Sequence, residues 1–202
     1  MASNTATPRE RLLPSIMPGA MSDTEVYGIN DNGQNVGFYR NPFAHGFVYD
    51  SGAFSILDYP GAIWTLPTAI DDGGQIAGMY TSPNPVDGSM EDHAFLNSAG
   101  TLTSIDSGGA RNDEIAYPGA GHTHVSGTND SGQIVGFYVL GGATHGFLYD
   151  GRSFTQIDYA GATDTFLYGI NGNADIVGQA YLPDLPGAPT PEPVALSCSP
   201  AF

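Results

Sequence analysis

A hairpin-like stretch that occurs four times constrains the fold of this chain more than any other feature. Each copy has a short apolar run, a turn rich in Asn, Asp and Gly, and a second apolar run with a glycine at a fixed place. The copies are residues 27–39, 68–80, 126–138 and, in a weaker form, 168–181. Turns of this composition suit positive φ and predict β-hairpins. The fixed glycines predict a close approach by a neighbouring sheet; they are Gly37, Gly78, Gly136 and Gly178.

Two further short strands are expected after each of the first three hairpins. One opens with a histidine, and the other ends in Ile-Asp or Leu-Asp. The histidines are His45, His93 and His145, and the aspartates are Asp58, Asp106 and Asp158. From Gly28 the repeat returns at Ala69, Gly127 and Gly169, which gives steps of 41, 58 and 42 residues. A four-strand unit of roughly 40 residues is typical of a β-propeller blade.

Composition and the chain ends complete the fold prediction. The 202 residues include 28 Gly and 15 Pro, and no long segment has helical apolar spacing, so the class is all-β. We predict a small β-propeller with four blades of about four antiparallel strands, closed by pairing of N- and C-terminal strands near Ser15-Ile16 and residues 194–196. Residues 1–11 form a flexible arm, 12–182 the propeller, and 183–202 a Pro-rich tail that contributes one strand. Completion of the ring by a second chain stays open.

The charge and the cysteine count exclude several classes of protein. A net charge of −16, from 21 acidic residues against five Lys and Arg, disfavours a nucleic-acid partner because phosphates are repelled. A single cysteine, Cys198, excludes an intrachain disulfide. No apolar run is long enough to span a membrane, and residues 1–20 lack the apolar core of a signal peptide.

The repeat resembles a known family. The succession Gly-Ile-Asn-Asp-x-Gly-Gln-Ile-Val-Gly-x-Tyr, then His-Gly/Ala-Phe-Leu-Tyr, then Phe-Thr-x-Ile-Asp-x-Pro-Gly-Ala is similar to the HAF-repeat family of extracellular bacterial proteins, whose name motif stands at His93-Ala94-Phe95. The resemblance covers residues 15–181 and implies an extracellular or cell-surface location, although a cytoplasmic one stays open. Residues 189–193 are similar to the start of a C-terminal sorting signal that begins Pro-Glu-Pro.

Candidate functional residues are those that break the repeat. Aligned on Pro-Gly-Ala, one variable column contains Trp64, His122 and Asp164, and a second contains His124 and Glu25. The residues of both columns lie where the chain begins the first strand of a hairpin. This strand lies nearest the axis of a propeller, so we expect these residues at one mouth of the channel. The ligand-binding set is Trp64, His122 and Asp164, joined by Tyr117 and Arg111 from a long loop.

These residues lead to three functional hypotheses. The first is a secreted-type binding module for a carbohydrate, another polymer or a small ligand, with Trp64, Tyr59, Tyr117 and Tyr159 as stacking residues. The second is a small hydrolase, lyase or isomerase at the channel mouth, for which the catalytic candidates are His122, His124, Asp164 and Glu25. No cofactor is predicted; a divalent metal stays open, with His122 and His124 as its ligands. The third is an assembly protein that forms homo-oligomers through its terminal arms.

Overall fold

The computed structural model describes residues 17–85, 87–105, 122–183 and 194–198. Within them the chain forms strands and turns, arranged as four antiparallel sheets. The predicted N-terminal arm, the strand near Ser15-Ile16, and the loop with Arg111 and Tyr117 lie outside this part of the chain. The described part contains no helix that is long and apolar enough to cross a membrane.

Each predicted repeat forms one sheet, which we call a blade, and three blades have four strands in chain order. Blade 1 contains β1 (Thr24–Ile29), β2 (Asn35–Arg40), β3 (Ala44–Asp50) and β4 (Ala53–Ile56). Blade 2 contains β5 (Trp64–Ile70), β6 (Ile76–Pro83), β7 (Met90–Ser98) and β8 (Thr101–Ser104). Blade 3 contains β9 (His122–Thr128), β10 (Ile134–Leu140), β11 (Ala143–Tyr149) and β12 (Phe154–Ile157).

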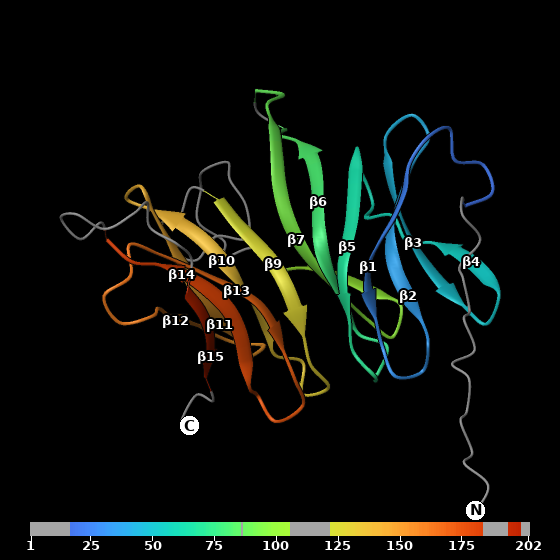
Figure 1. Cartoon of the computed structure of the whole chain (residues 1–202). Helices are drawn as coiled ribbons and strands as arrows, with labels where there is room; N and C mark the ends of the chain where they lie inside the picture. The colour runs from blue at the N-terminus through green and yellow to red at the C-terminus, as the bar shows by residue number, and fades with distance from the viewer. Residues whose placement is uncertain (1–16, 86, 106–121, 184–193, 199–202) are drawn as a thin grey trace, which may run out of the picture.

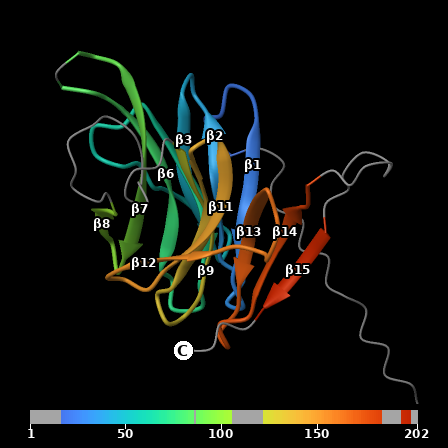
Figure 2. The same ribbon diagram turned by 90° about the vertical axis from the view of Figure 1, so that its left-hand side faces the viewer.

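Blade 4 takes its third strand from the C-terminal tail. It contains β13 (Asp164–Ile170), β14 (Ile176–Tyr181) and β15 (Val194–Cys198), and β15 pairs antiparallel with β14. Figure 2 shows β15 beside β14 at one edge of the molecule. The tail thus contributes one strand to blade 4. The predicted all-β class and the four blades of a β-propeller are confirmed (Figure 1).

The hairpin turns have the predicted backbone. Gly33, Gly74 and Gly132 have φ of 76°, 78° and 73° in the first three copies, the left-handed region that glycine enters without steric cost. The weaker fourth copy has Ala174 at the same place, with φ of 62°.

The fixed glycines have a different role from the predicted one. A methyl group added to Gly136 would stand 1.9 Å from the main-chain oxygen of His124, on the adjacent strand of the same blade. A bulge in each inner strand, for example between Val26 and Gly28, brings this oxygen over the glycine. The close neighbour is therefore the inner strand of the same sheet and not a neighbouring sheet.

Apolar residues between consecutive blades form the core. Val36 of blade 1 clusters with Ile70 and Ile76 of blade 2, and Val135 of blade 3 clusters with Leu167 and Ile176 of blade 4. The inner strands β1, β5, β9 and β13 also contact one another in succession. Consecutive blades thus bury apolar faces against each other, as a repeat architecture requires.

Candidate functional site

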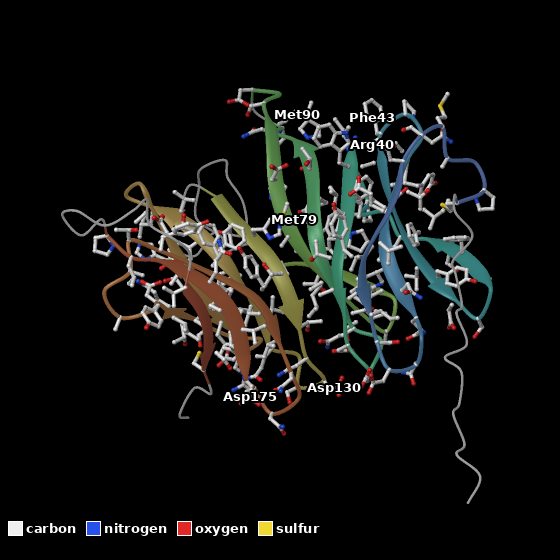
Figure 3. The ribbon with its side chains drawn as sticks, viewed as in Figure 1. Arg40, Phe43, Met79, Met90, Asp130 and Asp175 are labelled. Atoms are coloured by element: carbon white, nitrogen blue, oxygen red, sulfur yellow. The ribbon has the colours of Figure 1, made fainter. Side chains whose placement is uncertain are left out.

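The predicted columns lie at one end of the propeller. Trp64, His122 and Asp164 are the first residues of β5, β9 and β13. We call this the mouth end, and the opposite end, where the Gly-containing turns lie, the turn end. Figure 3 shows Arg40, Phe43 and Met90 at the mouth end and Asp130 and Asp175 at the turn end.

Trp64 is the largest exposed aromatic side chain in the predicted site, with 44% of its surface accessible. It lies directly opposite Thr81 on β6, and Thr81 lies opposite Asp92 on β7. Side chains opposite one another in a sheet share one face, and the Thr81 hydroxyl donates a hydrogen bond to Asp92. An apolar ring therefore stands beside a hydroxyl and a carboxylate.

His124 is held within an aromatic cluster. Its ring stacks on Phe137 with 4.8 Å between centroids and an interplanar angle of 5°, and Phe137 contacts Phe166 of blade 4. Nδ1 lies 3.4 Å from the Ser126 hydroxyl. Burial lowers the pKa of His124, so the neutral imidazole is favoured at neutral pH.

Asp164 and Glu25 have separate local partners. The Asp164 carboxylate accepts a 2.9 Å hydrogen bond from the Thr144 main-chain nitrogen of blade 3. Partial burial acts to raise the pKa of Asp164, but hydrogen bonds from Thr144 and Thr163 outweigh it and hold that pKa below its usual value. Glu25, on blade 1, accepts a hydrogen bond from Tyr27.

The predicted catalytic residues are thus distributed over three blades, each with its own neighbours. The side chain of His122 and the residues Tyr117 and Arg111 lie outside what the structure describes. Within the described residues, no group of three or more His, Cys, Asp and Glu side chains is placed to hold a metal.

Two of the recurring histidines, His45 and His145, are paired with a recurring aspartate of their own blade. Nδ1 of His45 lies 2.8 Å from Asp58, and Nδ1 of His145 lies 2.8 Å from Asp158. The second oxygen of each aspartate accepts a hydrogen bond from the next residue of the histidine strand, Gly46 or Gly146. Each pair therefore fastens the end of a fourth strand to the third strand of the same blade.

Two of the tyrosines predicted as stacking residues differ in their surroundings. Tyr59 stacks on Tyr80 at 3.7 Å between ring centroids, with an interplanar angle of 6°, so its face is occupied inside the core. Blade 4 has Ala180 at the position of Tyr80. There Tyr159 stays exposed beside a cavity of about 310 Å³ that Leu167, Leu196 and Cys198 also line.

The turn end contains a second feature, which the sequence analysis assigned to hairpin chemistry alone. A polar pocket of about 220 Å³ is lined by the ends of all four inner strands and their turns. Two residues there break the repeat. In the second copy, Asp71 stands where the other three copies have asparagine. In the third copy, Thr128 stands where the other three have isoleucine.

Asp71 is almost fully buried, with 6% of its surface exposed. One of its oxygens accepts a 2.7 Å hydrogen bond from the Gln75 nitrogen, and the side-chain oxygen of Gln75 is buried without a partner. Burial raises the pKa of Asp71, and the charges of Asp130 and Asp72 add to this against hydrogen bonds from the Gln75 and Gly73 main chain. A column-by-column comparison of the four turns would have singled out Asp71.

Comparison with known proteins supports the fold. No family model and no curated protein matches the chain. Among solved structures, the β-propeller domain of the Trilobed protease from Pyrococcus furiosus aligns with a TM-score of 0.51 at 10% identity, over 87% of this chain and 51% of that chain. TolB from Acinetobacter baumannii aligns with a TM-score of 0.53 at 11% identity, over 88% of this chain and 44% of that one.

The chain therefore spans about half the length of these two structures. At such low identity the likeness establishes the architecture only. Together with the sheet order, it defines this protein as a β-propeller.

Proposed function

We propose that this protein is a binding module whose ligand contacts the mouth end of blades 1 and 2, with a neutral carbohydrate polymer as the ligand class. The half-exposed Trp64 at the start of β5 is the observation that carries this proposal. A tryptophan face offers apolar area to the C–H face of a sugar, and its edge keeps a hydrogen-bond donor.

The surroundings of Trp64 support this proposal. Phe43 and Met90 expose more than half of their side chains at the same end of the molecule (Figure 3). Asp92, which accepts a hydrogen bond from the buried Thr81, and Arg40 add charged groups. Arg40 lies 3.8 Å from Asp23 and 5.3 Å from the centre of the Phe38 ring. Apolar platforms bordered by a few polar groups are typical of ligand sites.

The charge of the chain narrows the ligand class. A net charge of −16 disfavours anionic polymers such as nucleic acids or sulfated glycans because of long-range repulsion. A neutral glycan carries no such penalty. An extracellular location, which the HAF-repeat resemblance implies, would bring the protein into contact with such polymers and belongs to the same proposal.

The experiment is a glycan array followed by calorimetric titration of the best ligand. Trp64→Ala should weaken binding about five- to thirtyfold, since stacking on one aromatic side chain contributes on the order of 1–2 kcal/mol. Tyr168→Ala is the matched control, because Tyr168 is equally exposed but lies on blade 4, and it should bind as the unaltered protein does. Absence of any glycan ligand, or unchanged affinity in Trp64→Ala, would refute the proposal.

A further inference from the structure

The chain builds the same blade-to-blade contact three times. At each boundary, an apolar residue of an inner strand packs against a small residue on the third strand of the preceding blade. A methyl group on Gly46 would stand 2.8 Å from Pro67 Cγ, and one on Gly146 would stand 2.7 Å from Leu167 Cγ. At the middle boundary, Val125 packs in one cluster with Ala94.

Blade 1 carries the inner-strand half of this contact without a partner blade. Val26 occupies the repeat position of Pro67, Val125 and Leu167. Those three side chains are buried, whereas Val26 is 44% exposed and Ile29, further along the same strand, is also exposed. The inner-strand part of this face, which is covered at every other boundary, is therefore open at the first blade. The remainder of the face is buried, because Tyr39, Phe47 and Tyr49 pack in one cluster with Met17.

Blade 4 carries the opposite half of the contact. Val177 occupies the position of Val36, Ala77 and Val135, which are fully buried against the next blade, yet it is 50% exposed. The small residue of the third strand is Ala195, which pairs with Gln179 as Gly146 pairs with Phe137, and Ala195 is exposed. Across the described residues, blades 1 and 4 make no contact as extensive as those between consecutive blades.

We propose that the open face of blade 1 docks on the open face of blade 4 of a second copy of this chain. The occupant is identified by fit, because the three internal boundaries show what covers each half. At the internal boundaries, the residue at the position of Val26 packs on the small residue at the position of Ala195. The residue at the position of Val177 packs against the inner strand of the following blade. A two-fold axis along the propeller would bury both open faces of both copies at once and close the assembly as a dimer.

The composition of the two faces sets the strength of this association. On blade 1, the buried Asn35 stands where the other blades have Ile76, Ile134 and Ile176. On blade 4, the exposed Ser197 stands where Val48, Leu96 and Leu148 lie in the other third strands. These polar residues make the faces less apolar than the internal boundaries. The dimer is therefore reversible, and its fraction rises with protein concentration.

Disulfide trapping tests the contact directly. In a Cys198→Ser background, one preparation carries Val26→Cys and another carries Ala195→Cys; after mixing under mild oxidation, a covalent heterodimer should form. Ala94→Cys combined with Val125→Cys is the internal control and should crosslink within one chain, because these two residues lie in one buried cluster at the equivalent boundary.

The double variant Val26→Cys, Ala195→Cys separates the two ways of closing the ring. In dilute solution it should remain free of an intrachain bond and crosslink between chains as its concentration rises. An intrachain bond would mean that the chain closes on itself, and no crosslink in either arrangement would mean that the faces do not meet; each result would overturn the proposal.

Solution mass gives an independent readout. Light scattering should show a concentration-dependent dimer that Val26→Asp and Val177→Asp each convert to monomer. Ile56→Asp is the matched control, because Ile56 is an exposed apolar residue of the outer strand β4, and it should leave the dimer intact. A monomeric unaltered protein at every concentration would contradict the proposed interface.

Discussion

The side-chain amide of Asn30 donates a 2.8 Å hydrogen bond to the main-chain oxygen of Asp71, the residue at the same repeat position in the next blade. Asn129 makes the same bond to Asn171 at 2.9 Å. Each amide also donates to a glutamine oxygen of its own turn, Gln34 or Gln133. Asparagine at this position thus joins consecutive blades around the pocket at the turn end.

Asp71 cannot make this contact when it is ionised, and Asp71→Asn should therefore stabilise the protein. The new amide would reach Gln75 and the main-chain oxygen of Asn129, by analogy with Asn30. At neutral pH we expect a gain of about 1–2 kcal/mol in the free energy of unfolding, measured by urea denaturation. The matched control, Asn129→Asp, should destabilise by a similar amount, and a destabilised Asp71→Asn would contradict this interpretation.

The advantage of Asp71→Asn should depend on pH. Because the pKa of Asp71 is raised in the folded protein, this carboxyl contributes full stability below its unfolded-state pKa of about 4 and loses it as pH rises through the folded-state value. The stability gain of the variant should therefore be small at pH 4 and grow toward neutral pH. A gain that is constant from pH 4 to 7 would mean that ionisation of Asp71 is not its cause.

Gly136→Ala should be among the most destabilising single substitutions in the chain. The added methyl group would meet the His124 oxygen at 1.9 Å and the Phe147 ring at 2.8 Å, and neither can move without disturbing the sheet. We expect a loss of about 2–4 kcal/mol in thermal or chemical unfolding. Gly172→Ala serves as control, since a methyl group there meets nothing within 4 Å and should change stability by less than about 0.5 kcal/mol.

The architecture could be predicted from the sequence because four imperfect copies expose what every blade needs. Turn glycines such as Gly33 and the tail strand at residues 194–198 follow from local chemistry and from counting strands. The role of Gly136 did not follow, because the alternation of apolar residues assigns faces but does not reveal the bulge that brings the His124 oxygen over it.

The candidate site could be predicted only in part. Alignment of the copies places Trp64 and Asp164 at the starts of inner strands, where the structure has them. It does not show that Asp164 bonds to Thr144 of the preceding blade, or that Phe137 lies between His124 and Phe166, because such neighbours come from other blades. The importance of Asp71 likewise depends on main-chain atoms across a blade boundary.

Ala174→Gly should stabilise the fourth hairpin. Ala174 has φ of 62°, where a Cβ atom costs roughly 1–2 kcal/mol, part of which is offset by the greater flexibility of an unfolded glycine. The net gain in the free energy of unfolding should be about 0.5–1 kcal/mol. Gly132→Ala, at the same turn position of blade 3, is the reverse test and should lose at least as much; loss of stability in Ala174→Gly would contradict the argument.

His124→Phe should make the protein more resistant to acid. Blade 4 already has a phenylalanine, Phe166, at this repeat position, and the ring at His124 stacks in parallel on Phe137. Because burial lowers the pKa of His124, the unfolded chain binds a proton before the folded one does, and stability is lost as pH falls below about 6.5. The phenylalanine of the variant binds no proton. The free energy of unfolding of the variant should therefore increase relative to that of the unaltered protein as pH falls from 8 to 5, measured by denaturant titration. His45, His93 and His145 remain in both proteins, so the difference between the two pH profiles isolates His124, and parallel profiles would show that its protonation does not limit stability.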